Sequence, residues 1–132
     1  MNEQPPTARV RGGGAFEKLA SYSRAARVGK LIAVSGTAAL GEDGVALFPG
    51  DIYRQTRRAL ELGLEAAAQL GASPEQVLRT RLFLAPDSDW REAVRAHGEL
   101  FAGVDPANTT LFAGGFIPPG CLVEIEIDAA LP

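Results

Sequence analysis

The chain has 132 residues, of which 46% are hydrophobic and 22% charged, and its net charge at neutral pH is −3. This size and composition predict one globular domain with a substantial core and exclude a disordered or fibrous protein. The acidic balance argues against a basic track for a phosphate backbone, and no apolar stretch is long enough to span a bilayer, so no nucleic-acid or membrane partner is expected.

The N-terminal residues are polar and rich in glycine and proline, and they contain no apolar signal-peptide core. We therefore predict a flexible leader over residues 1–15, a single domain over residues 16–132, and a cytoplasmic protein.

Two adjacent strands are predicted after the leader. The first runs through residues 22–28, where Tyr22, Arg24, Ala26 and Val28 share one face because side chains two apart point the same way. The second is the apolar run of residues 31–37, with Gly29-Lys30 as a tight turn between the two. Glu42-Asp43-Gly44 predicts a further turn.

The longest predicted helix begins after Asp51, which suits an N-cap, and ends at Gly71, which supplies the C-terminal cap. Its buried stripe is rich in small residues, so the helix is expected to approach a sheet closely. The stripe consists of Ile52, Thr56, Ala59, Gly63, Ala66 and Leu70.

A capping box at Ser73-Pro74-Glu75-Gln76 predicts a short helical turn before a strand over residues 78–84. Leu78, Thr80, Leu82 and Leu84 are expected on one face of this strand and Arg79, Arg81 and Phe83 on the other. Asp87-Ser88-Asp89 then caps a second helix. Its predicted apolar stripe consists of Trp90, Ala93, Val94, His97 and Phe101.

The last quarter of the chain predicts two strands, over residues 106–112 and 121–129. The second alternates strictly, with Cys121, Val123, Ile125, Ile127 and Ala129 on one face and Glu124, Glu126 and Asp128 on the other. Cys121 is interpreted as a small buried hydrophobe. The three carboxylates are either a solvated face or part of a site.

These elements predict an α+β domain in which a mixed sheet carries two helices on one face. The opposite face then presents Tyr22 and Phe83 to solvent beside charged groups that include Arg79 and Arg81. Such a mixed surface favours a symmetric oligomer. The single histidine, His97, is interpreted as a structural imidazole, and neither a metal cluster nor a nucleotide-binding glycine motif is present, so no cofactor is expected.

Several short motifs occur in an order and spacing that resemble the Rid (RidA/YjgF) family. They are Tyr22-Ser-Arg-Ala-Ala-Arg-Val-Gly29, Val34-Ser35-Gly36, Asp51-x-x-x-Gln55-Thr56, Gly71-x-Ser73, Pro106-Ala107 and Val123-Glu124-Ile125-Glu126. The resemblance implies a chorismate-mutase-like fold and a homotrimer with a small-molecule ligand in clefts between subunits. It also implies, for the best-known branch, hydrolysis of enamines or imines to keto acids and ammonia without a cofactor.

The resemblance implies that Glu124 positions water on the imine and that Tyr22 and Ser35 line the pocket. The branch carries an arginine that grips the substrate carboxylate where this chain has Asn108, and an asparagine where it has Val94. A carboxamide offers neither the charge nor the bidentate fork of a guanidinium, so deamination of 2-aminoacrylate is not expected. The candidate site is Glu124 as the catalytic residue, with Tyr22, Arg24, Ser35, Thr37 and Asn108 binding the substrate.

Two functions remain open on these grounds. The chain is either a Rid-type hydrolase of a small imine, enamine or related C–N metabolite, or a non-catalytic protein that binds a small metabolite. It is also open whether Arg24, Arg79 or Arg81 replaces the missing arginine or instead pairs with the carboxylate row.

Overall fold

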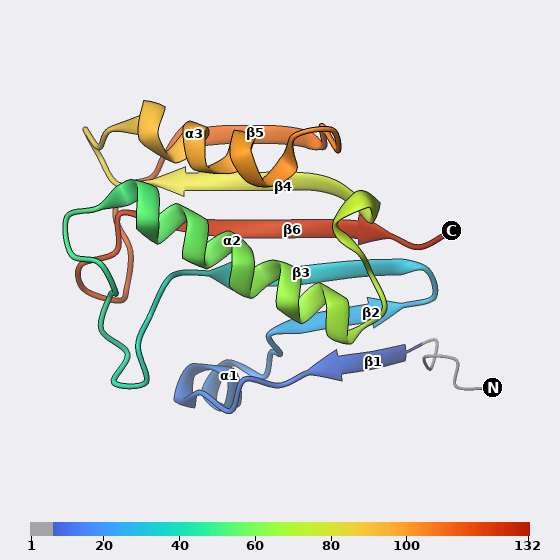
Figure 1. Cartoon of the computed structure of the whole chain (residues 1–132). Coiled ribbons are helices and arrows are strands. Elements are labelled where there is room, and N and C mark those ends of the chain that lie inside the picture. Colours follow the sequence, from blue (N-terminus) through green and yellow to red (C-terminus); the bar gives the residue numbers. More distant parts are fainter. Residues whose placement is uncertain (1–6) are drawn as a thin grey trace.

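The computed structural model describes residues 7–132 and consists of one sheet with helices on both of its faces (Figure 1). The elements in chain order are β1 (Thr7–Val10), α1 (Ala15–Ala20), β2 (Ala25–Val28), β3 (Leu31–Thr37), α2 (Ile52–Gln69), the short 3₁₀ helix η1 (Pro74–Gln76), β4 (Val77–Leu84), α3 (Trp90–Phe101), β5 (Ala107–Phe112) and β6 (Val123–Ala130).

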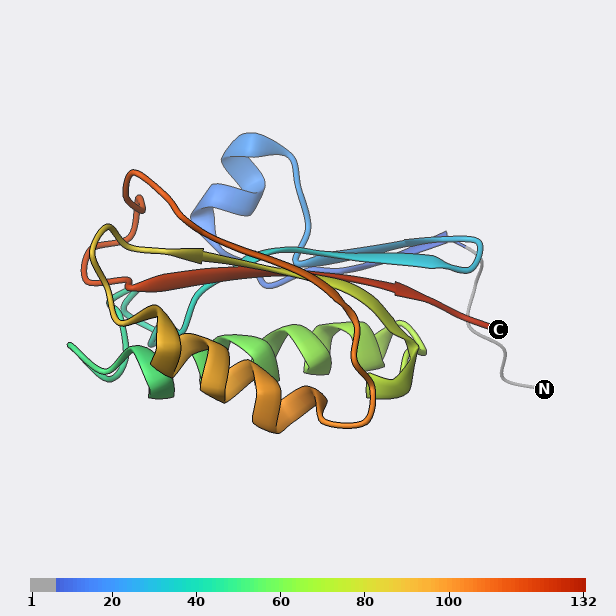
Figure 2. The same ribbon diagram turned by 90° about the horizontal axis from the view of Figure 1, so that it is seen from above.

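The strands lie in the order β1-β2-β3-β6-β4-β5, so the C-terminal strand is inserted in the middle of the sheet. β4 and β5 are parallel and all other neighbours are antiparallel. Because parallel neighbours need a crossover, α3 connects β4 to β5 across one face. The predicted α+β class with a mixed sheet and two long helices on one face is confirmed (Figure 2).

Strand β6 carries the centre of the core. Val123, Ile125 and Ile127 are fully buried beneath α2, whereas Glu124 and Glu126 on the other face are half-buried. The predicted alternation is therefore confirmed. Cys121 is also buried, but it precedes the strand by two residues.

Helix α2 begins as predicted, because the Asp51 side chain accepts a hydrogen bond of 3.0 Å from the Arg54 amide. Its small residues allow close contact with the sheet. A Cβ added to Gly63 would lie 2.8 Å from Cδ1 of Ile127 and 3.1 Å from Cδ1 of Ile125, so a larger residue would force these two side chains of β6 to shift.

The N-terminal region departs from the predicted leader. Residues 7–10 form the edge strand β1, which pairs with β2, and residues 15–20 form α1 on the face opposite α2 and α3 (Figure 2). Glu17 in α1 accepts a 2.9 Å hydrogen bond from the Gly12 amide, which ties the helix to the strand before it. Residues 1–6, the start of the predicted leader, lie outside the described residues.

Two of the predicted apolar stripes are wrong in part. A register shift between Val77 and Arg79 places Val77 in the core and leaves Leu78 59% exposed, because a bulge reverses the alternation of a strand. In α3, Ala93 and Phe101 are buried as predicted. Trp90 and Val94 are instead partly exposed, because they line a pocket between α3 and β5.

The predicted start of α3 is correct in position only, since Asp89 occupies the N-cap without a side-chain capping bond. Within residues 7–132, no helix combines the length and apolar character that crossing a bilayer requires.

Candidate functional site

A pocket of about 370 Å³ opens on the sheet face that carries α1. Its floor is the junction of β3 and β6, and its walls come from α1, from the segment that follows α1, and from the loop before β6. The lining residues are Phe16, Ala20, Tyr22, Arg24, Gly36, Ala38, Leu40, Ile117, Pro118 and Glu124. Three of the predicted site residues, Tyr22, Arg24 and Glu124, therefore meet in one pocket.

Glu124 lies against the backbone of β3 at Gly36. A Cβ added to Gly36 would be 2.1 Å from Oε1 of Glu124 and 3.1 Å from its carboxyl carbon. The pairing of β3 with β6 is irregular between Val34 and Thr37, next to this contact. Glycine at position 36 thus opens the space that the carboxylate occupies.

Burial raises the pKa of the Glu124 carboxyl above its usual range. The positive charge of Arg24 acts in the opposite direction, and the neighbouring Glu126 carboxylate adds to the increase. Among residues 7–132 the structure assigns Glu124 no hydrogen bond and no ion pair, so its carboxylate is free to bind water or a ligand. A glutamate of raised pKa is a stronger base than an exposed one.

Arg24 is directed into the pocket wall by the backbone. Its Nη2 donates a 2.5 Å hydrogen bond to the carbonyl oxygen of Gly36, the residue beneath Glu124. Its Nε is buried and has no partner among the described residues. The guanidinium therefore supports the floor of the pocket and contributes positive charge beside the carboxylate.

Ser35 and Thr37 do not line the pocket but lie behind its wall. The Ser35 hydroxyl donates to the carbonyl oxygen of Ser23 at 2.7 Å, and the Thr37 hydroxyl donates to the carbonyl oxygen of Ser35 at 2.7 Å. The first bond fixes the end of β3 against the segment that carries Arg24, and the second lies within β3 itself. These two predicted binding residues thus have structural contacts within the chain.

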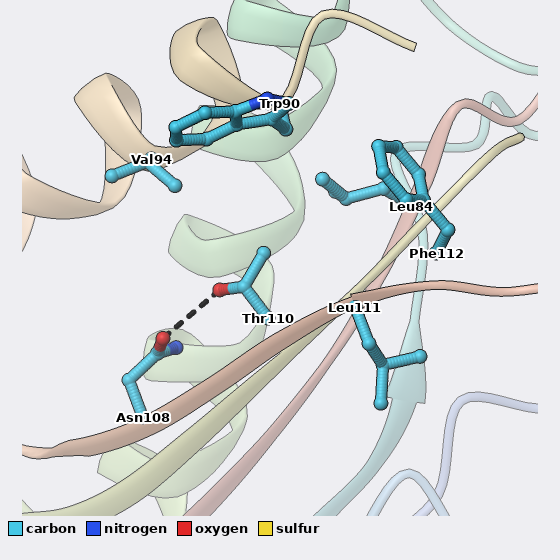
Figure 3. A pocket seen from close by; sticks show the side chains of 7 residues that line it. All are labelled: Leu84, Trp90, Val94, Asn108, Thr110, Leu111 and Phe112. Carbon is cyan, nitrogen blue, oxygen red and sulfur yellow. Dashed lines mark hydrogen bonds between the residues drawn. The ribbon is translucent and has the colours of Figure 1, made fainter. Parts of the chain in front are cut away.

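Asn108 lies in a second pocket, of about 440 Å³, on the helix-covered face at the β5 edge (Figure 3). The lining residues are Leu84, Trp90, Val94, Asn108, Thr110, Leu111 and Phe112. Asn108 and Thr110 point from β5 toward α3, where Trp90 and Val94 form the opposite wall, whereas Leu111 points away (Figure 3).

A chain of hydrogen bonds leads from this pocket into the core. The Thr110 hydroxyl donates to Oδ1 of Asn108 at 2.9 Å, and Nδ2 of Asn108 donates to Oγ1 of Thr80 at 3.1 Å. Oγ1 of Thr80 is 2.7 Å from Nε2 of His97. Burial lowers the pKa of His97, so its imidazole is uncharged at neutral pH, in agreement with the structural role predicted for it.

A single chain does not bring Asn108 to Glu124. The two side chains occupy different pockets on opposite faces of the sheet, one against α3 and the other against α1. The separation follows from the topology: Asn108 pairs with Thr80, whose side chain is fully buried under the helices, whereas Glu124 faces away from them.

The other two carboxylates of the β6 row, Glu126 and Asp128, have partners on the open face, which is the sheet face opposite α2 and α3. Nη1 of Arg81 lies 3.4 Å from Glu126 and 3.2 Å from Asp128, so of the two roles left open for Arg81 the structure shows the ion pair with the carboxylate row. Within residues 7–132, no group of three or more His, Cys, Asp or Glu side chains is arranged to hold a metal ion.

Sequence reasoning missed much of the apolar lining. Phe16, Ile117 and Pro118 in the Glu124 pocket, and Trp90 and Phe112 in the Asn108 pocket, come from loops, element ends or a stripe interpreted as core. The available signal was the presence of large apolar residues, Phe16 and Ile117, in otherwise polar connecting segments.

A family model, related sequences and solved structures each match most of this chain. The sequence model of the family described as endoribonuclease L-PSP matches residues 13–131. The uncharacterized protein SCO2049 of Streptomyces coelicolor is 39% identical over 121 residues, which cover 92% of this chain and 90% of that protein. The 3-aminoacrylate deaminase RutC of Acinetobacter baylyi is 29% identical over 107 residues, covering 81% of this chain and 84% of the enzyme.

Among solved structures, Rv2704 from Mycobacterium tuberculosis, a member of the YjgF/YER057c/UK114 family, superposes with a TM-score of 0.84 at 38% identity. The match covers 95% of this chain and 99% of the mycobacterial one.

Proposed function

The chain belongs to the endoribonuclease L-PSP (Rid/YjgF) family, and from that premise we propose that it hydrolyses a small imine, enamine or related C–N metabolite in clefts between copies of itself. The observation that carries the proposal is the half-buried Glu124, whose pKa is raised and whose carboxylate opens into a pocket without an ion-pair partner among residues 7–132. The similarity to a 3-aminoacrylate deaminase supports the same class of reaction. We place the reaction in the cytoplasm as part of this proposal.

In the proposed reaction, water attacks the carbon of a C=N bond. The water oxygen forms the new C–O bond while Glu124 accepts the water proton. Glu124 then returns this proton to the nitrogen, which gives a carbinolamine. In the second step Glu124 transfers the hydroxyl proton to the amino nitrogen, the C–N bond breaks as the C=O bond forms, and ammonia leaves the carbonyl product. The balance is one imine plus one water to one carbonyl compound plus one ammonia, and no external oxidant or reductant is required.

The other pocket residues have supporting roles in this scheme. Tyr22 closes one side of the pocket, and Arg24 holds the Gly36 carbonyl while its charge keeps part of the Glu124 population ionised. Ser35 and Thr37 fix the strand from which Gly36 is presented.

The proposal places Asn108 in the same cleft only when two copies meet. Because Asn108 and Glu124 lie on opposite faces of one sheet, the Asn108 pocket of one copy is proposed to face the Glu124 pocket of its neighbour in a homotrimer. Exposed apolar side chains near both pockets support such contact, among them Leu111 at the Asn108 pocket and Ile117 at the Glu124 pocket.

Ammonia release tests the catalytic assignment. The wild-type chain is expected to release ammonia from an uncharged imine and to act poorly on 2-iminopropionate, because Asn108 offers no cation to its carboxylate. Glu124→Gln should lower kcat by at least about 100-fold. Glu126→Gln is the matched control: Glu126 lies on the same strand face but pairs with Arg81, so activity should remain near wild type.

A non-catalytic metabolite-binding protein is the second candidate, and the asparagine at position 108 favours it, since the charged anchor of the deaminase branch is absent. Ligand-induced thermal stabilisation without ammonia release from any imine in the panel would select this function over the hydrolase.

A further inference from the structure

The carboxamide of Asn108 has two ends with different partners. Its nitrogen donates inward to Thr80, and its oxygen accepts from Thr110 at the pocket surface. A carbonyl oxygen has two lone pairs, so Oδ1 retains one acceptor position after the Thr110 bond is made. The nitrogen end is directed toward a side chain that is fully buried.

Thr80 and His97 fix this orientation. The Thr80 hydroxyl carries a single proton, and Nε2 of the uncharged His97 ring lies 2.7 Å from its oxygen. With the ring proton on Nδ1, Thr80 donates to Nε2 and accepts from Nδ2 of Asn108, so the Thr80 hydroxyl and both ends of the Asn108 carboxamide have partners. A reversed carboxamide would set its oxygen against an oxygen that has already committed its proton.

The pocket around Oδ1 contains no charged side chain. Apart from Asn108 and Thr110, its lining residues are apolar, with the Trp90 and Val94 side chains across from β5 (Figure 3). A carboxylate in this pocket would lose hydration and would meet an acceptor oxygen rather than a cation.

From this geometry we propose that the Asn108 pocket selects an uncharged ligand group that donates a hydrogen bond to Oδ1, such as a primary carboxamide, carried on a small apolar body. Thr80 and His97 are positioning residues that hold the carboxamide of Asn108 in the accepting orientation. This substrate class rests on the proposed function for its place in the catalytic cleft, but binding at the pocket can be measured without turnover.

The test uses three ligands of similar size: benzamide donates a hydrogen bond, N,N-dimethylbenzamide does not, and benzoate carries a charge. Trp90 is the single tryptophan of the chain and lies in the pocket, so its indole N–H gives an unambiguous resonance in ¹H–¹⁵N spectra. We expect benzamide to shift this resonance saturably, with a Kd at least about tenfold lower than that of either other ligand. Equal affinity for the three ligands, or no shift with benzamide, overturns the proposal.

Variants of the hydrogen-bond chain separate orientation from shape. Asn108→Leu keeps the apolar pocket and is expected to abolish the preference for benzamide over dimethylbenzamide. Thr80→Val removes the inward partner and should reduce the preference severalfold, whereas Thr80→Ser retains the hydroxyl and should preserve it. Should Thr80→Val fail to fold, Asn108→Leu decides alone: an unchanged preference in that variant overturns the proposal.

The outcome is independent of catalysis. Selective benzamide binding at Trp90 with no ammonia release from any imine removes the proposed hydrolase and leaves the ligand selectivity intact. Ammonia release that depends on Glu124 but is fastest with carboxylate-bearing imines supports the hydrolase and overturns the proposed selectivity for an uncharged ligand.

Discussion

The contact between Gly36 and Glu124 links the backbone of β3 to the proposed chemistry. Gly36→Ala places a methyl group where Oε1 of Glu124 lies, so the carboxylate must move. Because the displaced group is the far end of a flexible side chain, stability should change by less than about 1 kcal/mol. Activity should fall about 100-fold, since a shift of about 1 Å at a catalytic group has an effect of this order.

Steady-state kinetics and thermal unfolding of the single and double variants test this coupling. The double variant Gly36→Ala/Glu124→Gln should be no less active than Glu124→Gln alone, because both changes remove the same function. Multiplicative losses would show that Gly36 acts independently of the carboxylate.

Glu124 is also expected to make stability depend on pH. Its pKa is raised by burial in the folded chain, so the folded chain binds the proton more tightly than the unfolded chain, and folding becomes less favourable as the pH rises through this window. Glu124→Gln should therefore increase the free energy of unfolding at pH 7, on the order of 0.5 kcal/mol for a half-exposed group.

Chemical denaturation at pH 7 and at pH 4 measures this effect. The advantage of the glutamine variant should shrink at pH 4, where the wild-type carboxyl is largely protonated in the folded chain. A glutamine variant that is less stable than wild type at pH 7 would contradict the destabilising role of the ionised carboxylate.

At the residue scale, the sequence predicted the face on which Glu124 lies better than it predicted which side chains line the pocket around it. The alternation of β6 was enough to place Glu124 on the face away from the helices, because strand periodicity fixes the face of every side chain. It did not distinguish Tyr22 and Arg24, which line the pocket, from Ser35 and Thr37, which bond to nearby carbonyl groups. That distinction depends on where loops and α1 lie, which no local period encodes.

At the element scale, glycine has opposite effects in the two long helices. Gly63 in α2 faces Ile125 and Ile127 without room for a methyl group, whereas a Cβ added to Gly98 in α3 meets no atom within 4 Å. Gly63→Ala should destabilise the fold by about 1–2 kcal/mol, because overpacking exceeds the gain in helix propensity. Gly98→Ala should stabilise it by about 0.5–1 kcal/mol.

Urea denaturation of the two variants, which carry the same glycine-to-alanine change, compares the cost of overpacking with the gain in helix propensity. Stabilisation by both alanines would mean that the isoleucine side chains of β6 rotate away at little cost and that close packing does not explain the glycine in α2.

The long elements were predictable from sequence and the short or irregular ones were not. Helix α2 and strand β6 have caps or periods that extend over many residues, and both were predicted with nearly correct bounds. Strand β1 has four residues and helix α1 has six, so each repeats its period too few times to give a recognisable pattern. The bulge at the start of β4 reversed the faces at Val77 and Leu78. Tertiary pairing determines such elements.

At the scale of the whole molecule, the chain leaves apolar groups exposed beyond what one copy can bury. Leu111 is 44% exposed and points away from the Asn108 pocket (Figure 3), and its register neighbour Phe83 carries a second large apolar side chain on the same face. The face also holds the Arg81 ion pairs. Apolar groups beside paired charges are typical of a surface that associates with a copy of itself.

Leu111→Glu tests whether this face is the one on which copies assemble. The new carboxylate would be desolvated in an interface but lies in solvent in a single chain, so it should dissociate a trimer into monomers at micromolar concentration without unfolding the chain. Sedimentation velocity gives the mass, and circular dichroism reports the fold. Ala68→Glu, on the exposed side of α2, adds the same charge on the opposite face and should leave the trimer intact. If Leu111→Glu sediments like the wild type, the open face is not the interface, and Asn108 and Glu124 of neighbouring copies do not share a cleft across it.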